Sequence, residues 1–384
     1  DAGANRALLG MMGLSNTPQN WDDTWTFGIG PEWCFARDWT LRAGYLYLQS
    51  PIPDTTFAPT SLDVDQSLVS VGLGYQRGRH AARELFGEKI GLCGLMTPPI
   101  SYGHLNTLGA ELLFPEDGEV AVAPLASSMT EAIRILRQPR DMRKSGQLPF
   151  YLDFQRRLEE AFPSEKCALV FKPEGPLTTG YLLRGMDFFT DFYDDPVTFK
   201  LMMDAIVDSL IEYHQMLADL NGRHLPMENA GIADDVAAMI PASQWPELVM
   251  PYWSRLLSAL TNGTVSAHCE GLHPEQLPLL EEIGLRYYDP SISPVLTPEL
   301  VSKHCRIPFA WLLPVFQVPR MSCEEVRRFV LRAATAGASD IFYNISLPAL
   351  YQPEKALAFV EAGNQVREHL ASGGTRQTLP QALY

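Results

Sequence analysis

From about residue 82 onward, short apolar stretches alternate with longer amphipathic stretches, and this alternation constrains the fold more than any other feature. The apolar stretches have the length of strands, and they read KIGLCGLM, CALVFKP, HLPMENAGI, GTVSAHCE, LRYYDPS, PFAWLLPV and SDIFYNIS. Helical stretches such as DPVTFKLMMDAIVDSLIEYHQMLADL lie between them. Strands that alternate with helices form parallel sheets. We therefore predict an α/β fold of the TIM-type (β/α)8 barrel, with its first strand missing or replaced.

Residues 20–76 follow a different pattern, in which apolar side chains recur at every second position, as at Trp25, Phe27 and Ile29. A period of two indicates strands, because successive side chains of a strand point to opposite faces. The sequence therefore predicts two parts, a β-hairpin segment at residues 1–80 and the barrel at residues 81–384.

The hairpin segment resembles a family of membrane proteins. The stretches NWDDTWTFGIGPEW, DWTLRAGYLYLQSPIPD and DQSLVSVGLGYQ are similar to the C-terminal hairpins of the outer-membrane long-chain fatty-acid transporter family. Three or four strands cannot close a membrane barrel, which needs about eight or more. We therefore do not expect transport. Either the segment is a fused passenger, or its strands form a soluble cap in which LVSVGLGY or TWTFGIGP pairs with the barrel in place of the missing strand.

Charge and cysteine content narrow the class of protein. The formal charge of -15 comes without a basic block, so we expect no nucleic-acid partner. The six cysteines form no CxxC pair, which is typical of reduced thiols in a cytoplasmic protein. No run approaches the roughly 18 apolar residues of a membrane-spanning helix, so we expect no membrane contact for the barrel. The expected partner is a small-molecule substrate, and the oligomeric state stays open.

Residues that carry chemistry in parallel barrels lie where the strands end. The polar residues at the predicted strand ends are Glu174, Asp234, Asp235, His268, Glu270, Asp289 and Asn344. In SAHCEG, His268 and Glu270 are two positions apart and therefore face the same cavity, whereas Cys269 points toward the helical layer as a packing residue. One of the two adjacent aspartates can instead cap the helix that follows them.

The barrel region resembles the uroporphyrinogen decarboxylase superfamily over about residues 82–370. The resemblance rests on FKPEGPLTTGYLLRG, GIADDVAAMIPASQWPELVMPYW, SAHCEGLHPEQLPLLEEIG and FYNISLPALYQPEKALAFVEA. This superfamily contains tetrapyrrole decarboxylases and cobalamin-linked methyltransferases. The decarboxylases carry an arginine-rich N-terminal stretch and a histidine in the last loop. Neither occurs in this chain, whose last loop reads NISLPA, so the methyltransferase branch is the better match.

The methyltransferase branch holds zinc on an H-x-C motif and a later cysteine. His268 and Gly271 match that motif, but Glu270 replaces its cysteine, and Ser346 and Leu347 stand near the second cysteine position. The resemblance therefore implies a zinc site made of His268 and Glu270, with Asp235 or Glu174 as a third ligand. Zinc held by oxygen and nitrogen is a hard Lewis acid that suits an oxygen leaving group.

These implications define the expected function. We expect a corrinoid-dependent methyltransferase that demethylates a small methyl ether, with the corrinoid carried by a partner protein. The expected catalytic residues are Glu270, Asp235, Asp234 and Glu174, and the expected substrate-binding residues are Arg184, Tyr288 and Asn344. Arg184 can equally form an ion pair on a helix surface, and at most one of Tyr287 and Tyr288 can line the cavity.

Two alternatives stay open. The first is a metal-free decarboxylase of a small acid or tetrapyrrole, in which Asp234 or Asp235 protonates the product carbon and Arg184 binds the acid. The second is a non-catalytic chimeric remnant, because the expected first strand has been exchanged for membrane-protein hairpins.

Overall fold

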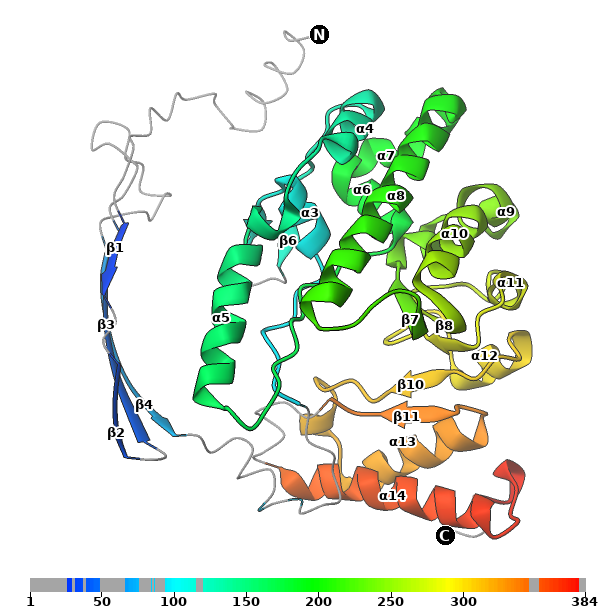
Figure 1. Cartoon of the computed structure of the whole chain (residues 1–384). Helices are drawn as coiled ribbons and strands as arrows, with labels where there is room; N and C mark the ends of the chain where they lie inside the picture. Colours follow the sequence, from blue (N-terminus) through cyan, green and yellow to red (C-terminus); the bar gives the residue numbers. More distant parts are fainter. Residues whose placement is uncertain are drawn as a thin grey trace, which may run out of the picture. The chain divides into compact units, whose positions relative to one another are not determined.

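The structure is a computed structural model of the whole chain (Figure 1). It describes residues 94–114, 120–344 and 352–379, as well as Glu84, Phe86 and the backbone of four strands between residues 26 and 75. The chain divides into two compact units, Asp1–Gly87 and Glu88–Tyr384.

The first unit contains an antiparallel sheet built around one long strand, β3 (Trp39–Leu48). Strand β4 (Gln66–Tyr75) pairs with β3 along its whole length. Strands β1 (Thr26–Ile29) and β2 (Glu32–Ala36) pair with the two ends of β3 and share its other edge. The predicted strands are therefore present. The expected pairing of residues 68–75 or 24–31 with the barrel concerns a contact between the two units and stays a prediction.

The second unit is built on parallel strands that follow one another in chain order. Neighbouring strands pair in parallel within the three-stranded sheet β7-β8-β9 and the two-stranded sheet β10-β11. Their bounds are β7 Met227–Ala233, β8 Thr261–His268, β9 Tyr287–Asp289, β10 Ala310–Leu312 and β11 Asp340–Phe342. A parallel bridge between Tyr288 and Phe309 links the two sheets.

Two earlier segments extend this series. Parallel bridges join Met96 to Ala168 and Ile100 to Phe171, and the backbone N–H of Gly175 donates to the carbonyl of Ala233 at the end of β7 (2.6 Å). Most of the predicted strand KIGLCGLM lies outside the described residues. A short antiparallel pair that the sequence did not predict, β5 (Leu112–Leu113) and β6 (Ala121–Val122), follows the first of these segments.

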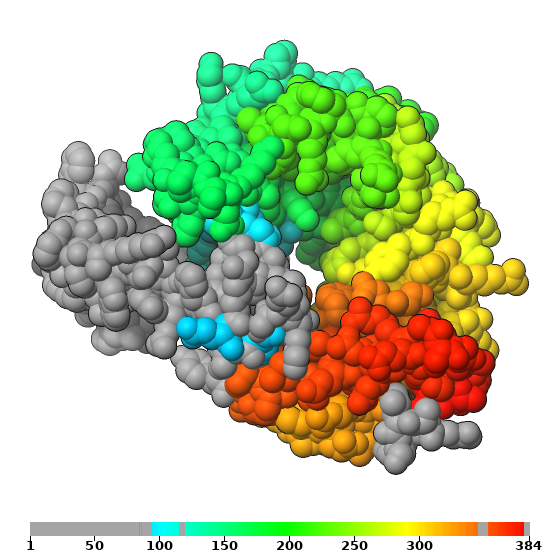
Figure 2. All heavy atoms as spheres, turned by 60° about the horizontal axis from the view of Figure 1, so that its bottom comes forward, coloured from blue at the N-terminus to red at the C-terminus, as the bar shows by residue number. Residues whose placement is uncertain are grey.

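The expectation of a barrel is met in part. Figure 2 shows the segments of the second unit following one another around a central hollow in the order of the sequence. Within the described ranges, no pairing joins β11 to residues 94–100. The parallel α/β architecture is therefore established, whereas a complete (β/α)8 barrel is not.

Helices of the second unit connect the strands, and the alternation predicted from the sequence is confirmed. The α-helices are α3 Gly103–Leu108, α4 Met129–Arg137, α5 Leu148–Ala161, α6 Pro176–Arg184, α7 Phe188–Asp194, α8 Pro196–Leu220, α9 Trp245–Leu248, α10 Met250–Leu260, α11 Leu277–Ile283, α12 Pro298–His304, α13 Cys323–Thr335 and α14 Pro353–Ala371. Short 3-10 turns lie between them, and η3 (Asp235–Met239) directly follows β7 and its Asp234.

Helices α8 and α13 begin at residues that cap their N-termini. Asp195 caps α8 by accepting from the N–H of Thr198, and Ser322 forms a capping box with Glu325 at the start of α13. In the region that the structure describes, no helix is both long enough and apolar enough to cross a membrane.

The core lies between the strands and the surrounding helices. Alternate strand residues are buried toward the helices, as Ile232, Ala267 and Tyr288 show. Their neighbours Ser266 and His268 keep part of their surface exposed on the other face. Because side chains alternate along a strand, this alternation of buried and exposed residues determines which strand-end residues are open to ligands and which are packed.

Candidate active site

His268 and Glu270 lie together at the end of β8. His268 is the last residue of the strand, and its Nε2 atom lies 4.0 Å from Oε1 of Glu270. Cys269 between them is 0% exposed and packs in the core, where its Sγ donates to the carbonyl of Asp234 (3.2 Å). The prediction that His268 and Glu270 share one side while Cys269 faces the helical layer is confirmed.

Asp289 orients the His268 ring from the neighbouring strand. The parallel register places these two residues side by side, and His268 Nδ1 lies 3.0 Å from Asp289 Oδ2. The other oxygen of Asp289 accepts from the N–H of Ser291 (2.8 Å). The hydrogen bond to Asp289 raises the pKa of His268, and it outweighs the burial that lowers it. The imidazole is therefore held with Nε2 turned toward Glu270.

Asp235 is linked to the same cluster through the backbone. Its Oδ1 accepts from the N–H of Glu270 (2.7 Å), so the loop after β8 is fastened to the turn after β7. Asp235 is exposed at the surface, yet the protein around it removes enough solvation to raise its pKa. The hydrogen bond from Glu270 and the charge of His268 act in the opposite direction.

Glu174 is the proton-holding carboxyl of the cluster. Burial raises its pKa to about 8, and the charges of Asp234 and Asp235 contribute further. The charge of His268 and a hydrogen bond with Ser101 lower it again, but by less. A carboxyl with this pKa is mostly protonated at neutral pH and can donate a proton.

Gly175 allows Glu174 to lie close to the end of β7. A Cβ atom at position 175 would lie 2.5 Å from Cβ of Asp234, which is closer than real Cβ contacts allow. The glycine therefore permits the backbone hydrogen bond from Gly175 to Ala233. This hydrogen bond joins the turn that contains Glu174 to the end of β7.

Asp234 does not belong to the open site, and its predicted catalytic role is wrong. The residue is 0% exposed, so its carboxylate cannot meet a substrate. Its oxygens accept from the N–H groups of Leu177 (3.1 Å) and Thr178 (2.6 Å) and from Nε1 of Trp253 (2.6 Å). It therefore holds the first turn of α6, rather than the helical turn that follows it in sequence. Burial raises its pKa to about 6 despite these hydrogen bonds.

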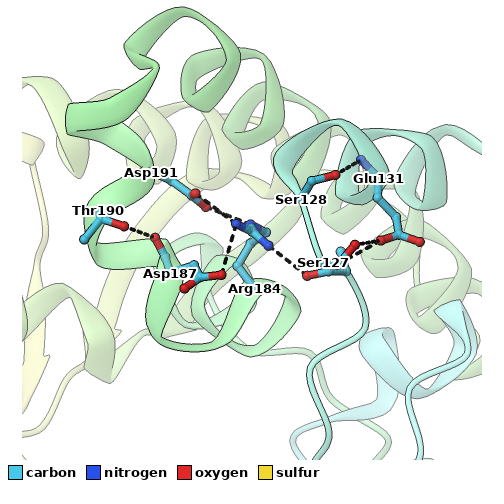
Figure 3. Close-up of polar contacts among 8 residues, drawn as sticks. Ser127, Ser128, Glu131, Arg184, Asp187, Thr190 and Asp191 are labelled. Atoms are coloured by element: carbon cyan, nitrogen blue, oxygen red, sulfur yellow. Dashed lines mark hydrogen bonds and ion pairs between the residues drawn. The ribbon is translucent and has the colours of Figure 1, made fainter. Parts of the chain in front are cut away.

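Arg184 is structural, which corrects the prediction that it binds substrate. Its side chain is 5% exposed, and Nε and Nη2 donate to the two carboxylate oxygens of Asp191 at 2.8 and 2.9 Å (Figure 3). Nη1 donates to the carbonyl of Ala126 (2.9 Å), and Asp187 lies 3.6 Å from Nη2. The ion-pair alternative is right, but the pair is buried because α7 turns back onto the end of α6.

Tyr288 also faces away from the cavity, so its predicted substrate contact is wrong. It is 0% exposed, and its hydroxyl donates to the carbonyl of Cys269 (3.0 Å). Tyr287 lines the cavity instead, with its hydroxyl donating to Asp340 (3.1 Å). Asn344 is exposed two residues after β11, and its proposed substrate contact stays a prediction.

A cavity of about 540 Å³ adjoins the cluster. Its walls include Gly231, Ser266, His268, Tyr287 and Asp289 from the strands, and residues of α8 and the turn after it. A larger groove of about 680 Å³ lies between α7, α8 and α10 and contains none of the strand-end residues. Of these two cavities, the smaller is the one that His268 and Asp289 line, whereas Glu174, Asp235 and Glu270 are not part of its wall.

A comparison with known protein families shows to which family the chain belongs. The family model for uroporphyrinogen decarboxylase (URO-D) matches residues 95–294, more than half of the 384-residue chain. The chain belongs to the uroporphyrinogen decarboxylase family. The matched span contains Glu174, Asp235, His268, Glu270 and Asp289, so the whole cluster lies in the family domain.

Further comparisons found a family match for the hairpin segment and a solved structure with a similar fold. The model for outer membrane protein transport proteins (OMPP1/FadL/TodX) matches residues 6–82, in agreement with the resemblance of the hairpin segment. A methyltransferase from Methanosarcina mazei has a similar structure, with a TM-score of 0.54 and 15% sequence identity, covering 74% of this chain and 83% of that chain. At this identity the likeness establishes the fold alone. A search of curated proteins found no match.

The donors in this member of the family do not fit the expected zinc. Among the described residues, no three His, Cys, Asp or Glu side chains are grouped so that they could hold a metal ion. Nδ1 of His268 is bonded to Asp289, which leaves Nε2 as its one nitrogen that could ligate a metal, and Oδ1 of Asp235 accepts from the backbone N–H of Glu270. We therefore assign no step to a metal, and the zinc set His268, Glu270 and Asp235 stays a prediction.

Proposed function

We propose that this member of the uroporphyrinogen decarboxylase family transfers a methyl group from a small methyl ether to an acceptor outside the chain. The observation that carries the proposal is the protonated Glu174 beside His268 at the strand ends. Methyl transfer from an ether needs a proton for the departing oxygen, because a free alkoxide is a poor leaving group. Glu174 provides that proton at neutral pH.

The reaction balances without a metal ion bound by this chain. The bond between the methyl carbon and the ether oxygen breaks, its electron pair stays on oxygen, and the Glu174 proton moves to that oxygen. The methyl carbon forms its new bond to the nucleophile of the acceptor. The acceptor that we propose is a reduced corrinoid carried by a partner protein, which supplies this nucleophile when it is bound.

His268 and Asp289 assist the leaving group. When the His268 ring is protonated, its Nδ1–H donates to Asp289 and its Nε2–H can donate toward negative charge that develops on the oxygen. Glu270 lies on the same side as this nitrogen, with its Oε1 atom 4.0 Å from Nε2. In this proposal Glu174 is the general acid, His268 stabilises charge, and Asp235 positions the loop that carries Glu270.

A second candidate uses the same proton donor. In a metal-free decarboxylation, the bond from the substrate carbon to its carboxylate breaks, carbon dioxide leaves, and Glu174 protonates the carbon. Lys172 in the cavity wall favours this candidate, because it can pair with a carboxylate. The sequence favoured Asp234 or Asp235 as the proton donor and Arg184 for binding the acid, and of these Asp234 and Arg184 are buried in structural contacts.

Product analysis on the full-length chain separates the candidates. The chain is mixed with chemically reduced cobalamin and a panel of small methyl ethers, and methylcobalamin and the demethylated alcohol are measured. Methyl transfer predicts that both products form in equal amounts, and that Glu174→Gln lowers the rate by about 100-fold or more. Glu282→Gln, an exposed change on α11, is the matched control and keeps the full rate. Carbon dioxide released from a small acid, with no methylcobalamin formed, would instead establish the decarboxylase.

A further inference from the structure

We infer that Tyr287, held by Asp340, limits the size of the substrate that the cavity beside His268 accepts. The identity of the substrate as a methyl ether rests on the proposed function, whereas the boundary that Tyr287 forms is a property of the cavity itself. In this assignment Tyr287 determines specificity and takes no part in the proton transfer.

Tyr287 lies on the same face of the sheet as His268. The parallel register pairs Ser266 of β8 with Tyr287 and His268 with Asp289, and all four residues line the cavity. Tyr288, the next residue of β9, is 0% exposed and faces the helices. Because side chains alternate along a strand, Tyr287 projects into the cavity two positions before Asp289.

The Tyr287 side chain reaches across a whole strand. Its hydroxyl donates to Oδ2 of Asp340 (3.1 Å), the first residue of β11. Strand β10 lies between the two, because it is bridged to β9 and pairs with β11. Neighbouring strands are about 4.8 Å apart, so this bond places the tyrosine ring over the inner face of β10. Burial raises the pKa of Tyr287, so the hydroxyl keeps the proton that it donates.

Strand β10 leaves room for the ring at Ala310. Tyr288 and Phe309 form a parallel bridge and are both buried, so the next residue of β10, Ala310, projects to the inner face. Ala310 is in register with Asp340 and therefore lies between the two strands that the tyrosine joins. It is only 1% exposed, which agrees with a ring that covers it.

The cavity ends at this ring. Its wall takes residues from the segment 168–173, from α8 and the turn after it, and from β7, β8 and β9. Strands β10 and β11 continue the series, yet none of their described residues belongs to that wall. The bond between Tyr287 and Asp340 therefore separates the cavity from the strands beyond it. Without the ring, the apolar side chains of Ala310 and Leu312 would become part of a larger cavity.

Two ethers of different length test this boundary. Turnover of methyl propyl ether and methyl hexyl ether is measured as kcat/KM with chemically reduced cobalamin. The unmodified chain should prefer the propyl ether, because the longer chain meets the ring. Tyr287→Ala should raise the hexyl-to-propyl ratio by about tenfold or more, since each methylene group that becomes buried adds about fourfold. Tyr287→Phe keeps the ring and should keep the ratio of the unmodified chain.

The matched control is Tyr193→Ala, which removes the same ring from a position that is 64% exposed and outside this cavity. It should leave the ratio unchanged. Tyr287→Leu is a second variant that shortens the side chain but keeps it apolar, and it should raise the ratio in the same direction. Thermal unfolding shows which variants are folded. An unchanged ratio in a folded Tyr287→Ala or Tyr287→Leu, or an equal rise in Tyr193→Ala, would overturn the boundary.

Unreactive alcohols distinguish this inference from the proposed function. Calorimetry measures the binding of 1-propanol and 1-hexanol to the full-length chain and to Tyr287→Ala. If the variant gains affinity for 1-hexanol alone but no ether is ever demethylated, the boundary stands and the methyl transfer fails. If both ethers are demethylated and Tyr287→Ala leaves their ratio unchanged, the methyl transfer stands and the boundary fails.

Discussion

His268 Nδ1 and Asp289 Oδ2 lie 3.0 Å apart at the ends of two adjacent parallel strands. The two residues are 21 positions apart in sequence, and the strand register alone brings them together. Their hydrogen bond fixes which ring nitrogen faces the cavity. It also makes the protonated form of His268 more stable than it would be in solution.

Removal of this carboxylate should change the titration of His268. In Asp289→Asn, the pKa of His268 should fall, since the largest cause of its upward shift is lost while the burial that lowers it remains. The pH titration of the His268 ring signals by NMR measures this change. Asp340→Asn, which alters the partner of Tyr287, serves as the control and should leave the titration in place. An unchanged pKa in Asp289→Asn would contradict the assigned cause.

The same substitution at Asp234 and at Asp235 should lower the stability by very different amounts. Asp234→Ala leaves three buried donors without an acceptor and should lower the free energy of unfolding by roughly 3 kcal/mol or more. Asp235→Ala loses one backbone contact at an exposed position, so we expect a loss of about 1 kcal/mol. Urea unfolding measures both values. Similar losses in the two variants would show that Asp234 is not the structural residue.

Glu174 should make the stability of the chain depend on pH. Its pKa is about 8 in the folded chain and close to 4.5 when unfolded, so the folded state binds more protons between these values. The free energy of unfolding should therefore decrease as pH rises from about 4.5 to 8. Glu174→Gln cannot lose a proton, so the variant should gain stability relative to the unmodified chain across this window. Thermal unfolding at pH 5 and pH 8.5 measures the difference, and a constant difference would refute the raised pKa.

The same protonation predicts the pH dependence of turnover. The rate should fall as pH rises through about 8, because Glu174 then loses the proton that it donates. A pH profile of kcat for methylcobalamin formation tests this limb. A rate that keeps rising above pH 9 would mean that Glu174 acts as a base or takes no part.

Arg184 and Asp191 should be strongly coupled. Arg184→Met leaves the buried Asp191 charge uncompensated, which costs about 3 to 5 kcal/mol. The double variant Arg184→Met/Asp191→Leu removes both charges and should recover most of that loss. A double-mutant cycle by urea unfolding measures the coupling. Additive losses would contradict the pairing.

The sequence by itself determined the local structure of both units. The period of two predicted the strands of the first unit, and the strand and helix alternation predicted the parallel α/β part of the second. The i, i+2 rule placed His268 and Glu270 on one side and Cys269 in the core. These inferences succeed because side-chain direction along a strand follows from backbone geometry that involves only neighbouring residues.

Only the tertiary structure decided which polar groups meet. The carboxylate of Asp234 contacts a turn 57 residues earlier, and the guanidinium of Arg184 contacts a carbonyl 58 residues away. No local pattern distinguishes these buried residues from the open Asp235. Whether Tyr287 or Tyr288 faces the cavity likewise depended on which side of β9 is buried, and its pairing with β8 sets that side. Register, burial and charge pairing arise from contacts between distant segments, so they are set by packing rather than by the order of residues along one strand.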